Sequence, residues 1–311
     1  MSPGERFLVL GATGFFGSHI TEELRTAGQE VVPAARDGVK GPSFDLLDPA
    51  GMRKLLSSWK PNCVINAAGA SSPAAAIRDP AGAFLANASG TLNLLEAIRQ
   101  ETPDALLLSL SSAAVYSGGP PFTEESETEA RTPYSASKLS AEIICEQYVR
   151  WAGARVAIVR CFNLTGPGEP SGQATSEFCR AARQAKPGDS ARVEVGDPAI
   201  TRDITDVRDA ARAVKEIGVA GLAGTYNICS AKPRSLASIA ETISEVSGRH
   251  LELASSESRR RSGEAPASYG SAELLRKATG WEPVISFRQS MTDLLGSIPE
   301  ANSDGGGPNH R

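Results

Sequence analysis

The sequence predicts an α/β protein with a doubly wound parallel sheet and a smaller α/β domain toward its C-terminus. Three observations lead to this fold class. Short apolar segments alternate with helical patterns through the first half of the 311 residues, and a glycine-rich turn follows the first segment. Strands that alternate with helices form parallel sheets covered on both faces. The alternation weakens after about residue 164, which indicates a second domain.

The first half of the chain carries the stronger pattern. The apolar segment Arg6–Leu10 stops at Gly11, and a proline at position 61 ends the second helical pattern. Leucines and an isoleucine at positions 92, 95 and 98 share one face of the third helical pattern. The predicted strands are 6–10, 30–35, 63–67, 105–109 and 155–160, and the predicted helices are 18–26, 50–59, 83–99 and 134–151.

The second half has a weaker alternation and begins with a loop rich in glycine and proline at 165–172. The predicted helices are 176–185, 236–246 and 272–279, and the predicted short strands are 193–195, 225–228 and 251–253. We therefore expect a first domain at 1–164, a cap at 165–299 with segments near 203–230 returning to the main sheet, and a disordered tail at 300–311.

Composition excludes several classes of protein. The net charge of −4 provides no basic face for a nucleic acid. The five cysteines have no CxxC spacing, so we expect neither a metal site nor a disulfide framework. We expect them instead to be small buried thiols in a reducing compartment. The sequence contains neither an apolar signal segment nor the roughly 18 apolar residues of a membrane span. These features favour a cytoplasmic protein without a nucleic-acid or membrane partner.

The glycine-rich turn Gly11-Ala-Thr-Gly14-Phe-Phe-Gly17 lies between the first predicted strand and the first predicted helix. Glycines allow a tight turn and the close approach of a diphosphate, and a helix N-terminus offers free N–H groups with a positive dipole end. The spacing GxxGxxG is one residue longer than the GxGxxG dinucleotide fingerprint. After the first strand of a βαβ unit, the turn predicts a dinucleotide-binding Rossmann domain rather than a purely structural turn.

This turn resembles that of the short-chain dehydrogenase/reductase superfamily in its extended branch, and the resemblance covers nearly the whole chain. Asn66-Ala67-Ala68-Gly69 is similar to the motif beside the cofactor, and Asn87–Leu95 is similar to the helix that follows it. Asp45, followed by Leu46, resembles the acidic residue near the adenine ring. The resemblance implies the following cofactor-binding residues: Gly11, Thr13, Gly14, Phe15, Phe16, Gly17, Asp45, Leu46, Ala67, Ala68, Gly69 and Asn87.

The end of the second strand indicates which nicotinamide cofactor is preferred. A carboxylate there binds the ribose of NAD, whereas an arginine accommodates the 2′-phosphate of NADP. The sequence has Ala35 where NAD-binding relatives carry the acid, and Arg36 follows it. This arrangement favours NADP(H). A shift of one residue would present Asp37 instead, which leaves NAD(H) open, and Arg36 would then be an ordinary surface arginine.

Tyr134 and Lys138 lie one helical turn apart and so share a helix face. A tyrosine titrates near about 10, and a neighbouring ammonium stabilises its phenolate and lowers that value. In the extended branch the catalytic serine or threonine precedes two residues and then Val-Tyr, which identifies Ser112. The resemblance implies that Tyr134 transfers the proton, Ser112 polarises the substrate carbonyl, Lys138 also holds the cofactor ribose, and Asn87 supports a proton relay.

The residues after Ser112 narrow the chemistry further. Sugar-nucleotide 4,6-dehydratases of this family carry acidic residues there, whereas this chain has Ala113 and Ala114, which do no acid–base work. The GDP-fucose synthase type needs a cysteine in place of Ala114 and a histidine in the cap, and no histidine of this chain fits. A simple hydride transfer remains, as keto reduction or as the oxidation and re-reduction of an epimerase.

The second half resembles the GDP-4-keto-6-deoxymannose reductases. Their motifs correspond to 160–168, 201–210, 226–230 and 278–283. Asn163 and Arg202 match positions that contact the nucleotide-sugar diphosphate, and Arg261 resembles a further diphosphate arginine or belongs to a solvated loop. This chain departs from the pattern at Ser271, where aspartate is usual, and at Cys161, where proline is usual.

The sequence thus predicts an NADPH-dependent reductase of 4-keto nucleotide-diphosphate sugars that uses Ser-Tyr-Lys chemistry. A nucleotide-sugar 4-epimerase with tightly bound NAD is the alternative within the family. A non-catalytic NADP-binding sensor is an alternative of a different class, but such proteins often lose the Tyr-Lys pair that this chain keeps. The helices at about 83–99 and 134–151 resemble the dimer-forming pair of the family, so we expect a homodimer.

Overall fold

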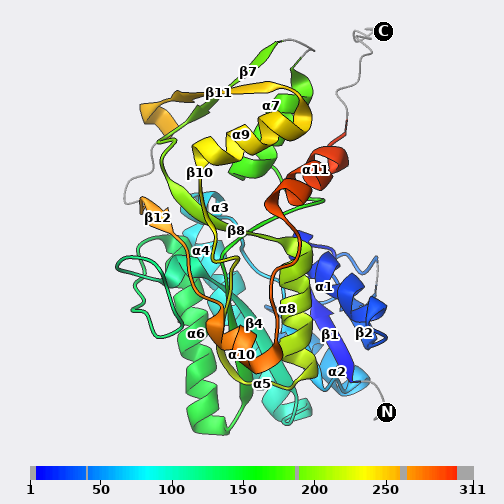
Figure 1. Ribbon diagram of the computed structural model, residues 1–311. Coiled ribbons are helices and arrows are strands. Elements are labelled where there is room, and N and C mark those ends of the chain that lie inside the picture. Colours follow the sequence, from blue (N-terminus) through cyan, green and yellow to red (C-terminus); the bar gives the residue numbers. More distant parts are fainter. Residues whose placement is uncertain (1–4, 40, 186–188, 260–264, 300–311) are drawn as a thin grey trace, which may run out of the picture. The chain divides into compact units, whose positions relative to one another are not determined.

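The structure is a computed structural model that describes residues 5–39, 41–185, 189–259 and 265–299 (Figure 1). The chain forms two compact units. The first comprises Met1–Leu164, Arg202–Pro233 and Ala267–Val284, and the second comprises Thr165–Thr201, Arg234–Pro266 and Ile285–Arg311. The chain therefore leaves the first unit and returns to it twice.

A six-stranded parallel sheet forms the centre of the first unit. Its order is β2-β1-β3-β4-β5-β9, and every neighbouring pair is parallel. This confirms the predicted fold class. Pro33 is tolerated in β2 because that strand lies at an edge of the sheet. The strands are β1 (Arg6–Leu10), β2 (Glu30–Ala34), β3 (Cys63–Asn66), β4 (Leu106–Ser112), β5 (Arg155–Cys161) and β9 (Gly224–Ile228).

Helices cover both faces of this sheet, and the alternation of strand side chains explains how. Phe7 and Val9 of β1 pack with α1 (Phe15–Thr26) and α8 (Val207–Val219). Leu8 and Leu10, one residue along, belong to the opposite apolar cluster with α2 (Pro49–Trp59), α5 (Gly90–Glu101) and α6 (Pro133–Ala152). Successive strand residues point to opposite faces, so a continuous apolar strand requires a helix layer on each side.

The first unit also contains short elements that connect these layers. They are helices α3 (Pro73–Arg78), α4 (Pro80–Phe84) and α10 (Glu273–Thr279), a π-helical turn at Leu85–Ser89, a 3₁₀ turn at Ala113–Val115 and strand β12 (Ala267–Ser268). Strand β12 joins a four-stranded sheet with β6 (Asn163–Thr165), β8 (Thr201–Asp206) and β10 (Pro233–Ser235), in which β8 pairs with each of the other three.

The second unit packs three helices with a two-stranded parallel sheet. Its helices are α7 (Ala174–Gln184), α9 (Leu236–Ser247) and α11 (Phe287–Ser297), and its strands are β7 (Ser190–Val195) and β11 (His250–Ser255). Glu169 is buried at the start of α7, where both carboxylate oxygens accept hydroxyl hydrogen bonds of 2.6 Å from Thr165 and Thr175. Burial raises the pKa of this carboxyl group.

Several predicted elements are wrong in extent. The single helix predicted at 83–99 is interrupted, because the chain forms α4, then the π-helical turn, then α5. The strand predicted at 105–109 continues to Ser112, so Ser111 and Ser112 lie in the strand rather than beyond it. Helices α3, α8 and α11 and strand β8 cover segments for which no element was predicted. In the case of α8, Asp206 caps the helix through a 2.9 Å bond from the Arg208 N–H.

Two further expectations concern the C-terminal tail and membrane-spanning helices. The tail at 300–311, predicted to be disordered, lies outside the described residues. Of the helices within the described ranges, none combines the length and the apolar character that a membrane crossing requires.

Candidate active site

The glycine turn between β1 and α1 is shaped by backbone contacts that exclude side chains. Gly11 has a φ of +82°, and a Cβ there would lie 2.8 Å from the carbonyl carbon of Ala67. A Cβ on Gly17 would lie 2.1 Å from the carbonyl oxygen of Gly11. The Gly11 and Ala12 N–H groups donate to the carbonyl of Ala34, at 3.0 and 3.1 Å. Glycine is therefore required at positions 11 and 17 by packing of the turn itself.

This turn lies at the switch point of the sheet. β2 and β3 flank β1 on opposite sides, so the chain changes direction across the sheet after β2. Ligands of doubly wound sheets bind at the carboxyl ends of the strands at such a point. Thr13 and Gly14 are exposed there, and Gly14, the N-cap of α1, has no side chain to cover the first-turn N–H groups. These residues fit a pyrophosphate at the helix N-terminus.

Asp45 and Leu46, predicted near the adenine, are held in a fixed loop next to α5. The Asp45 carboxylate accepts the Leu47 N–H at 2.9 Å, and the Leu46 carbonyl accepts the Asn93 side-chain amide at 2.9 Å. Leu46 is buried against Gly90, where a Cβ would come within 2.9 Å of it. Asn93 and Gly90 were not among the predicted site residues, although both lie in the motif that carries Asn87.

Arg36 and Asp37 follow β2 and are both exposed. The Asp37 carboxylate accepts the Val39 N–H at 3.2 Å and so closes its own turn. The Arg36 carbonyl accepts the Ser43 hydroxyl at 3.0 Å, which fixes the backbone of Arg36. The structure thus places an arginine at the end of β2 and engages the neighbouring carboxylate locally.

Asn87 connects the loop after β3 with helix α6. Its side-chain oxygen accepts the Ala70 N–H at 3.0 Å, and its amide donates to the Ala70 carbonyl at 3.1 Å and to Ser137 Oγ at 2.9 Å. Gly69 lies so close that a Cβ there would be 2.4 Å from the same oxygen. Asn87 belongs to the π-helical turn, a distortion that is frequent at functional sites.

The structure brings Ser112, Tyr134 and Lys138 together where α6 packs on the end of β4. Thr132 and Ser135 form a capping box at the start of α6, with Pro133 in the first turn, which places Tyr134 at the beginning of the helix. Ser112 is the last residue of β4 and lies beside the Tyr134 side chain, where it acts to lower the tyrosine pKa. The Lys138 ammonium donates to the Leu110 carbonyl at 2.9 Å. Ser137, between them, donates to the Tyr134 carbonyl at 2.8 Å.

Burial changes the protonation of both titratable groups of the trio. It raises the pKa of Tyr134 to about 12, so the expectation that the neighbouring lysine lowers this pKa is wrong; the contact with Ser112 opposes the rise. Burial lowers the pKa of Lys138 to about 8, and the neighbouring Glu142 carboxylate opposes this effect. At neutral pH the tyrosine therefore holds its proton and the lysine is mostly charged. A protonated phenol beside a serine hydroxyl can donate a proton to an oxygen placed between them.

The residues predicted to contact the diphosphate are only partly described. Asn163 lies in β6 and Arg202 in β8, and these two strands pair with each other. Arg261 lies outside the described residues. The structure therefore brings two of the three predicted residues onto neighbouring strands.

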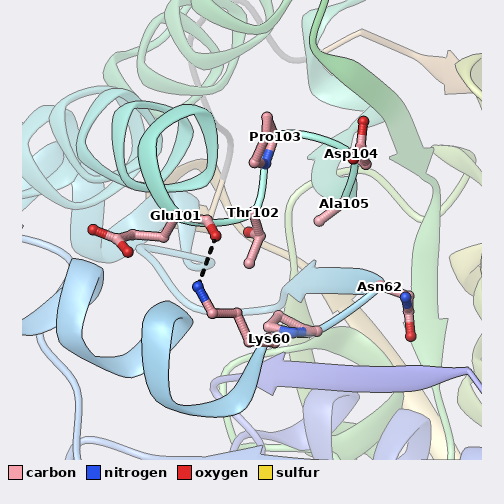
Figure 2. Close-up of a pocket in the computed structure, with 8 residues that line it drawn as sticks. Lys60, Asn62, Glu101, Thr102, Pro103, Asp104 and Ala105 are labelled. Atoms are coloured by element: carbon pink, nitrogen blue, oxygen red, sulfur yellow. Dashed lines mark hydrogen bonds between the residues drawn. The ribbon is translucent and has the colours of Figure 1, made fainter.

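A cavity of about 240 Å³ lies at the amino ends of β3 and β4, opposite the strand ends that carry the glycine turn (Figure 2). It is lined by Lys60–Asn62, which precede β3, and Glu101–Ala105, which precede β4. The Lys60 ammonium donates to the Glu101 carbonyl at 3.3 Å across it. None of the predicted site residues lines this cavity.

A glycine turn at the switch point, with a buried tyrosine, a lysine and a serine at the same strand ends, defines a dinucleotide-dependent oxidoreductase of the Rossmann class. The chain belongs to the NAD dependent epimerase/dehydratase family, whose profile matches residues 7–229. It is an NAD(P)-dependent short-chain oxidoreductase.

Three comparisons give more detail. GDP-6-deoxy-D-mannose reductase from Pseudomonas aeruginosa is 33% identical over 94% of this chain and 96% of its own. The structure of RMD from Pseudomonas aeruginosa complexed with NADPH superposes with a TM-score of 0.85 at 32% identity, covering 94% of this chain and 98% of that one. UDP-glucose 4-epimerase from Thermus thermophilus, in complex with NAD, gives a TM-score of 0.83 at 27% identity, covering 94% and 98%.

We expect Gly17→Ala to weaken binding of a nicotinamide dinucleotide by at least about tenfold, because its Cβ would push the Gly11 carbonyl out of the turn. Gly14→Ala is the matched control. Its Cβ would lie 3.3 Å from the same oxygen, a contact that a small shift relieves, so its loss should be smaller. Fluorescence titration with NADPH measures both. Equal affinities in the wild type and Gly17→Ala would contradict this account of the turn.

Proposed function

We propose that this protein is an NADPH-dependent reductase of a 4-keto-6-deoxy nucleotide sugar. The observation that carries the proposal is the buried contact of Ser112 with Tyr134, one helical turn from Lys138, at the strand ends that carry the glycine turn. A protonated tyrosine in this position suits the reductive direction, in which a new hydroxyl group must receive a proton.

In the proposed reaction, the turn from Gly11 to Gly17 would hold NADPH, which when bound would supply the hydride for the keto carbon. The Ser112 hydroxyl donates a hydrogen bond to the carbonyl oxygen and orients it. The Tyr134 phenol gives its proton to the same oxygen as negative charge develops there, and the product is an alcohol. The Lys138 ammonium stabilises the phenolate that is left, and solvent then returns the proton to Tyr134.

The absence of acid–base groups after Ser112 supports reduction over dehydration. Ala113 is buried in the 3₁₀ turn, and Ala114 contributes only its backbone N–H, which donates to Ser112 Oγ at 3.2 Å. Neither side chain can remove a proton from the sugar or protonate a leaving hydroxyl group. These two positions therefore support hydride and proton transfer over dehydration.

The relatives support two candidates within this chemistry. The GDP-6-deoxy-D-mannose reductase relative and the NADPH complex of RMD favour the reductase. The UDP-glucose 4-epimerase with NAD favours an epimerase, which would oxidise and re-reduce its substrate on one resident cofactor. We favour the reductase because Ala35 and Arg36, rather than an acid, are the first residues after β2.

A diphosphate handle on the substrate is the second part of the proposal. Asn163 and Arg202, on the paired strands β6 and β8, offer an amide and a guanidinium group, and guanidinium groups suit phosphate oxygens. We propose that they bind the nucleotide diphosphate, with Arg261 as a further contact. Binding energy from this remote group would orient the keto carbon for reaction.

The proposed setting is a homodimer in the cytoplasm. Apolar side chains on α5 and α6 are exposed, among them Leu92, Ile143 and Trp151, of which Ile143 is 56% exposed. A second copy of this surface would cover them. The five cysteines are buried free thiols, as a reducing compartment would leave them.

Tyr134→Phe should lower kcat by at least about a hundredfold, because the phenol proton is lost, while NADPH affinity stays within about twofold. The assay follows NADPH absorbance with a panel of 4-keto-6-deoxy nucleotide sugars. GDP, UDP and dTDP are added as competitors to test the diphosphate handle. Activity of the variant within a few-fold of wild type would refute the mechanism. Reduction of free keto sugars, without inhibition by any nucleotide, would refute the substrate class.

Arg36→Asp should reverse or erase a preference for NADPH over NADH, because a carboxylate repels the 2′-phosphate and accepts the 2′-hydroxyl. The ratio of kcat/KM for the two cofactors is the measurement. Asp37→Asn is the control, since Asp37 is engaged with Val39 and should leave the ratio nearly unchanged. Equal kcat/KM values of the wild type for NADPH and NADH would contradict the proposed preference for NADPH.

Ile143→Arg should convert the proposed dimer to a monomer, because a charge would replace an exposed apolar side chain on the proposed interface. Light scattering coupled to size exclusion gives the mass. Val284→Arg, at a 75% exposed position outside α5 and α6, should leave the dimer intact. A monomeric wild type would refute the proposed assembly.

A further inference from the structure

A buried polar cluster lies directly behind the proposed catalytic trio. Glu142 on α6, Arg160 on β5 and Ser111 on β4 are 2%, 6% and 8% exposed. Arg160 donates to both carboxylate oxygens of Glu142, with its shortest bond at 2.7 Å. The Ser111 hydroxyl donates to the same carboxylate. Three elements of the first unit are thus joined by one carboxylate.

This cluster touches the same two elements as the trio. Ser111 immediately precedes Ser112 and is the register partner of Arg160 across β4 and β5. Glu142 lies one helical turn after Lys138, so the two side chains extend from the same face of α6. Lys138 holds the Leu110 carbonyl, and Glu142 holds the Ser111 hydroxyl. Two consecutive turns of α6 are therefore hydrogen-bonded to two consecutive residues at the end of β4.

Arg160 extends the cluster to the segment that follows Ser112. Its guanidinium donates to the Glu124 carbonyl at 3.1 Å and lies 4.8 Å from the centre of the Tyr116 ring. The Tyr116 hydroxyl donates to the Asn227 side chain at 2.6 Å, and the Asn227 N–H donates to the Glu124 carboxylate at 2.9 Å. The end of β4 that carries Ser112 is therefore held by contacts with α6 and by contacts with the segment that follows Ser112.

An ion pair as buried as this one is a poor source of net stability. Removing both charges from water costs several kcal/mol per ion, and an apolar replacement of similar volume is often as stable. What such a pair provides is direction, because a bidentate guanidinium–carboxylate contact fixes the geometry of both partners. Because the pair lies next to Ser112 and Lys138, its fixed geometry also bears on the positions of these two residues.

We propose that Glu142 and Arg160 are positioning residues that fix the spacing between Ser112 and the Tyr134–Lys138 face of α6. This rests on the proposed Ser-Tyr-Lys function. Both side chains are buried, so the role that we propose for them is positioning rather than contact with the substrate. Glu142 acts through Ser111 on the strand and through its charge on Lys138, and Arg160 keeps the carboxylate in place.

The charge of Glu142 also has a predictable effect on Lys138. The titratable groups around this ammonium are Tyr134 and Glu142 on α6 and Cys161 on β5, with Arg160 behind Glu142. Burial raises the pKa of Cys161 to about 12 and that of Tyr134 to about 12, so both are neutral where Lys138 titrates. Glu142 is then the negative charge that opposes loss of the Lys138 proton. Removing it should lower the pKa of Lys138.

The test compares Glu142→Gln, Ser111→Ala and Asp209→Asn in the full-length protein. Glu142→Gln keeps the size of the side chain but removes its charge. Ser111→Ala keeps the charge but removes the anchor to β4. Asp209→Asn is the matched control, because Asp209 is a 1% exposed carboxylate paired with Arg212 on α8, away from the trio. The readouts are kcat, NADPH affinity and the titration of Lys138, followed by ¹⁵N-lysine NMR and assigned with Lys138→Met.

We expect Glu142→Gln to lower kcat about tenfold or more, with NADPH affinity within about threefold, and to lower the pKa of Lys138 by about half a unit or more. Ser111→Ala should lower kcat without moving the Lys138 titration, and Asp209→Asn should change neither. Folded Glu142→Gln with wild-type kcat and wild-type Lys138 titration would overturn the proposal, as would an equal shift in Asp209→Asn.

The remaining outcomes are also decisive. If Glu142→Gln does not fold, Ser111→Ala decides, and a wild-type kcat in that variant would overturn the positioning role. If the wild type reduces no sugar of the panel, the proposed function fails, while the NMR titration of the unliganded protein still tests the coupling of Glu142 to Lys138.

Discussion

The packing of α6 on the end of β4 is the constraint on which the rest of the site depends. Tyr134 and Lys138 sit one turn apart on the helix, and Leu110 and Ser112 end the strand. Three contacts join the two elements, one on each of three consecutive turns of α6. They are Tyr134 with Ser112, Lys138 with Leu110, and Glu142 with Ser111. Because these bonds follow the helical repeat, a shift of α6 along the strand would break all three together.

The carboxyl edge of the sheet also determines where the glycine turn and the Ser112–Tyr134–Lys138 trio lie. In a parallel sheet every carboxyl end lies at one edge. Gly11 and Ala67, which follow β1 and β3, and Ser112, the last residue of β4, therefore lie at the same edge. Asn87 links the loop after β3 with α6 through Ser137. Hydrogen bonds therefore join the loop after β3 to α6, and burial raises the pKa of the Tyr134 phenol. This combination suits delivery of a hydride and a proton to one carbonyl group.

Much of this could be predicted from the sequence, and the failures have physical causes. Apolar strands and the glycine spacing are local patterns, so the sheet and its turn were predictable. The interruption before α5 was not, because the π-helical turn depends on Asn87 bonding to Ala70 and Ser137, which are distant in sequence. Ser111, Glu142 and Arg160 went unnoticed for the same reason, since their pairing exists only after β4, β5 and α6 assemble. The helix at α8 had a local signal, an Asp206 cap before an apolar repeat.

The central claim is that the protein transfers hydride from exchangeable NADPH to a sugar carbonyl, rather than recycling it on a resident cofactor. The most direct measurement uses NADPH deuterated at C4 of the nicotinamide, with a 4-keto-6-deoxy nucleotide sugar and mass spectrometry of the product. Our account predicts one deuterium in each product molecule and one NADPH consumed for each. Product without deuterium, or interconversion of 4-hydroxy sugars without consumption of added NADPH, would contradict it and identify an epimerase.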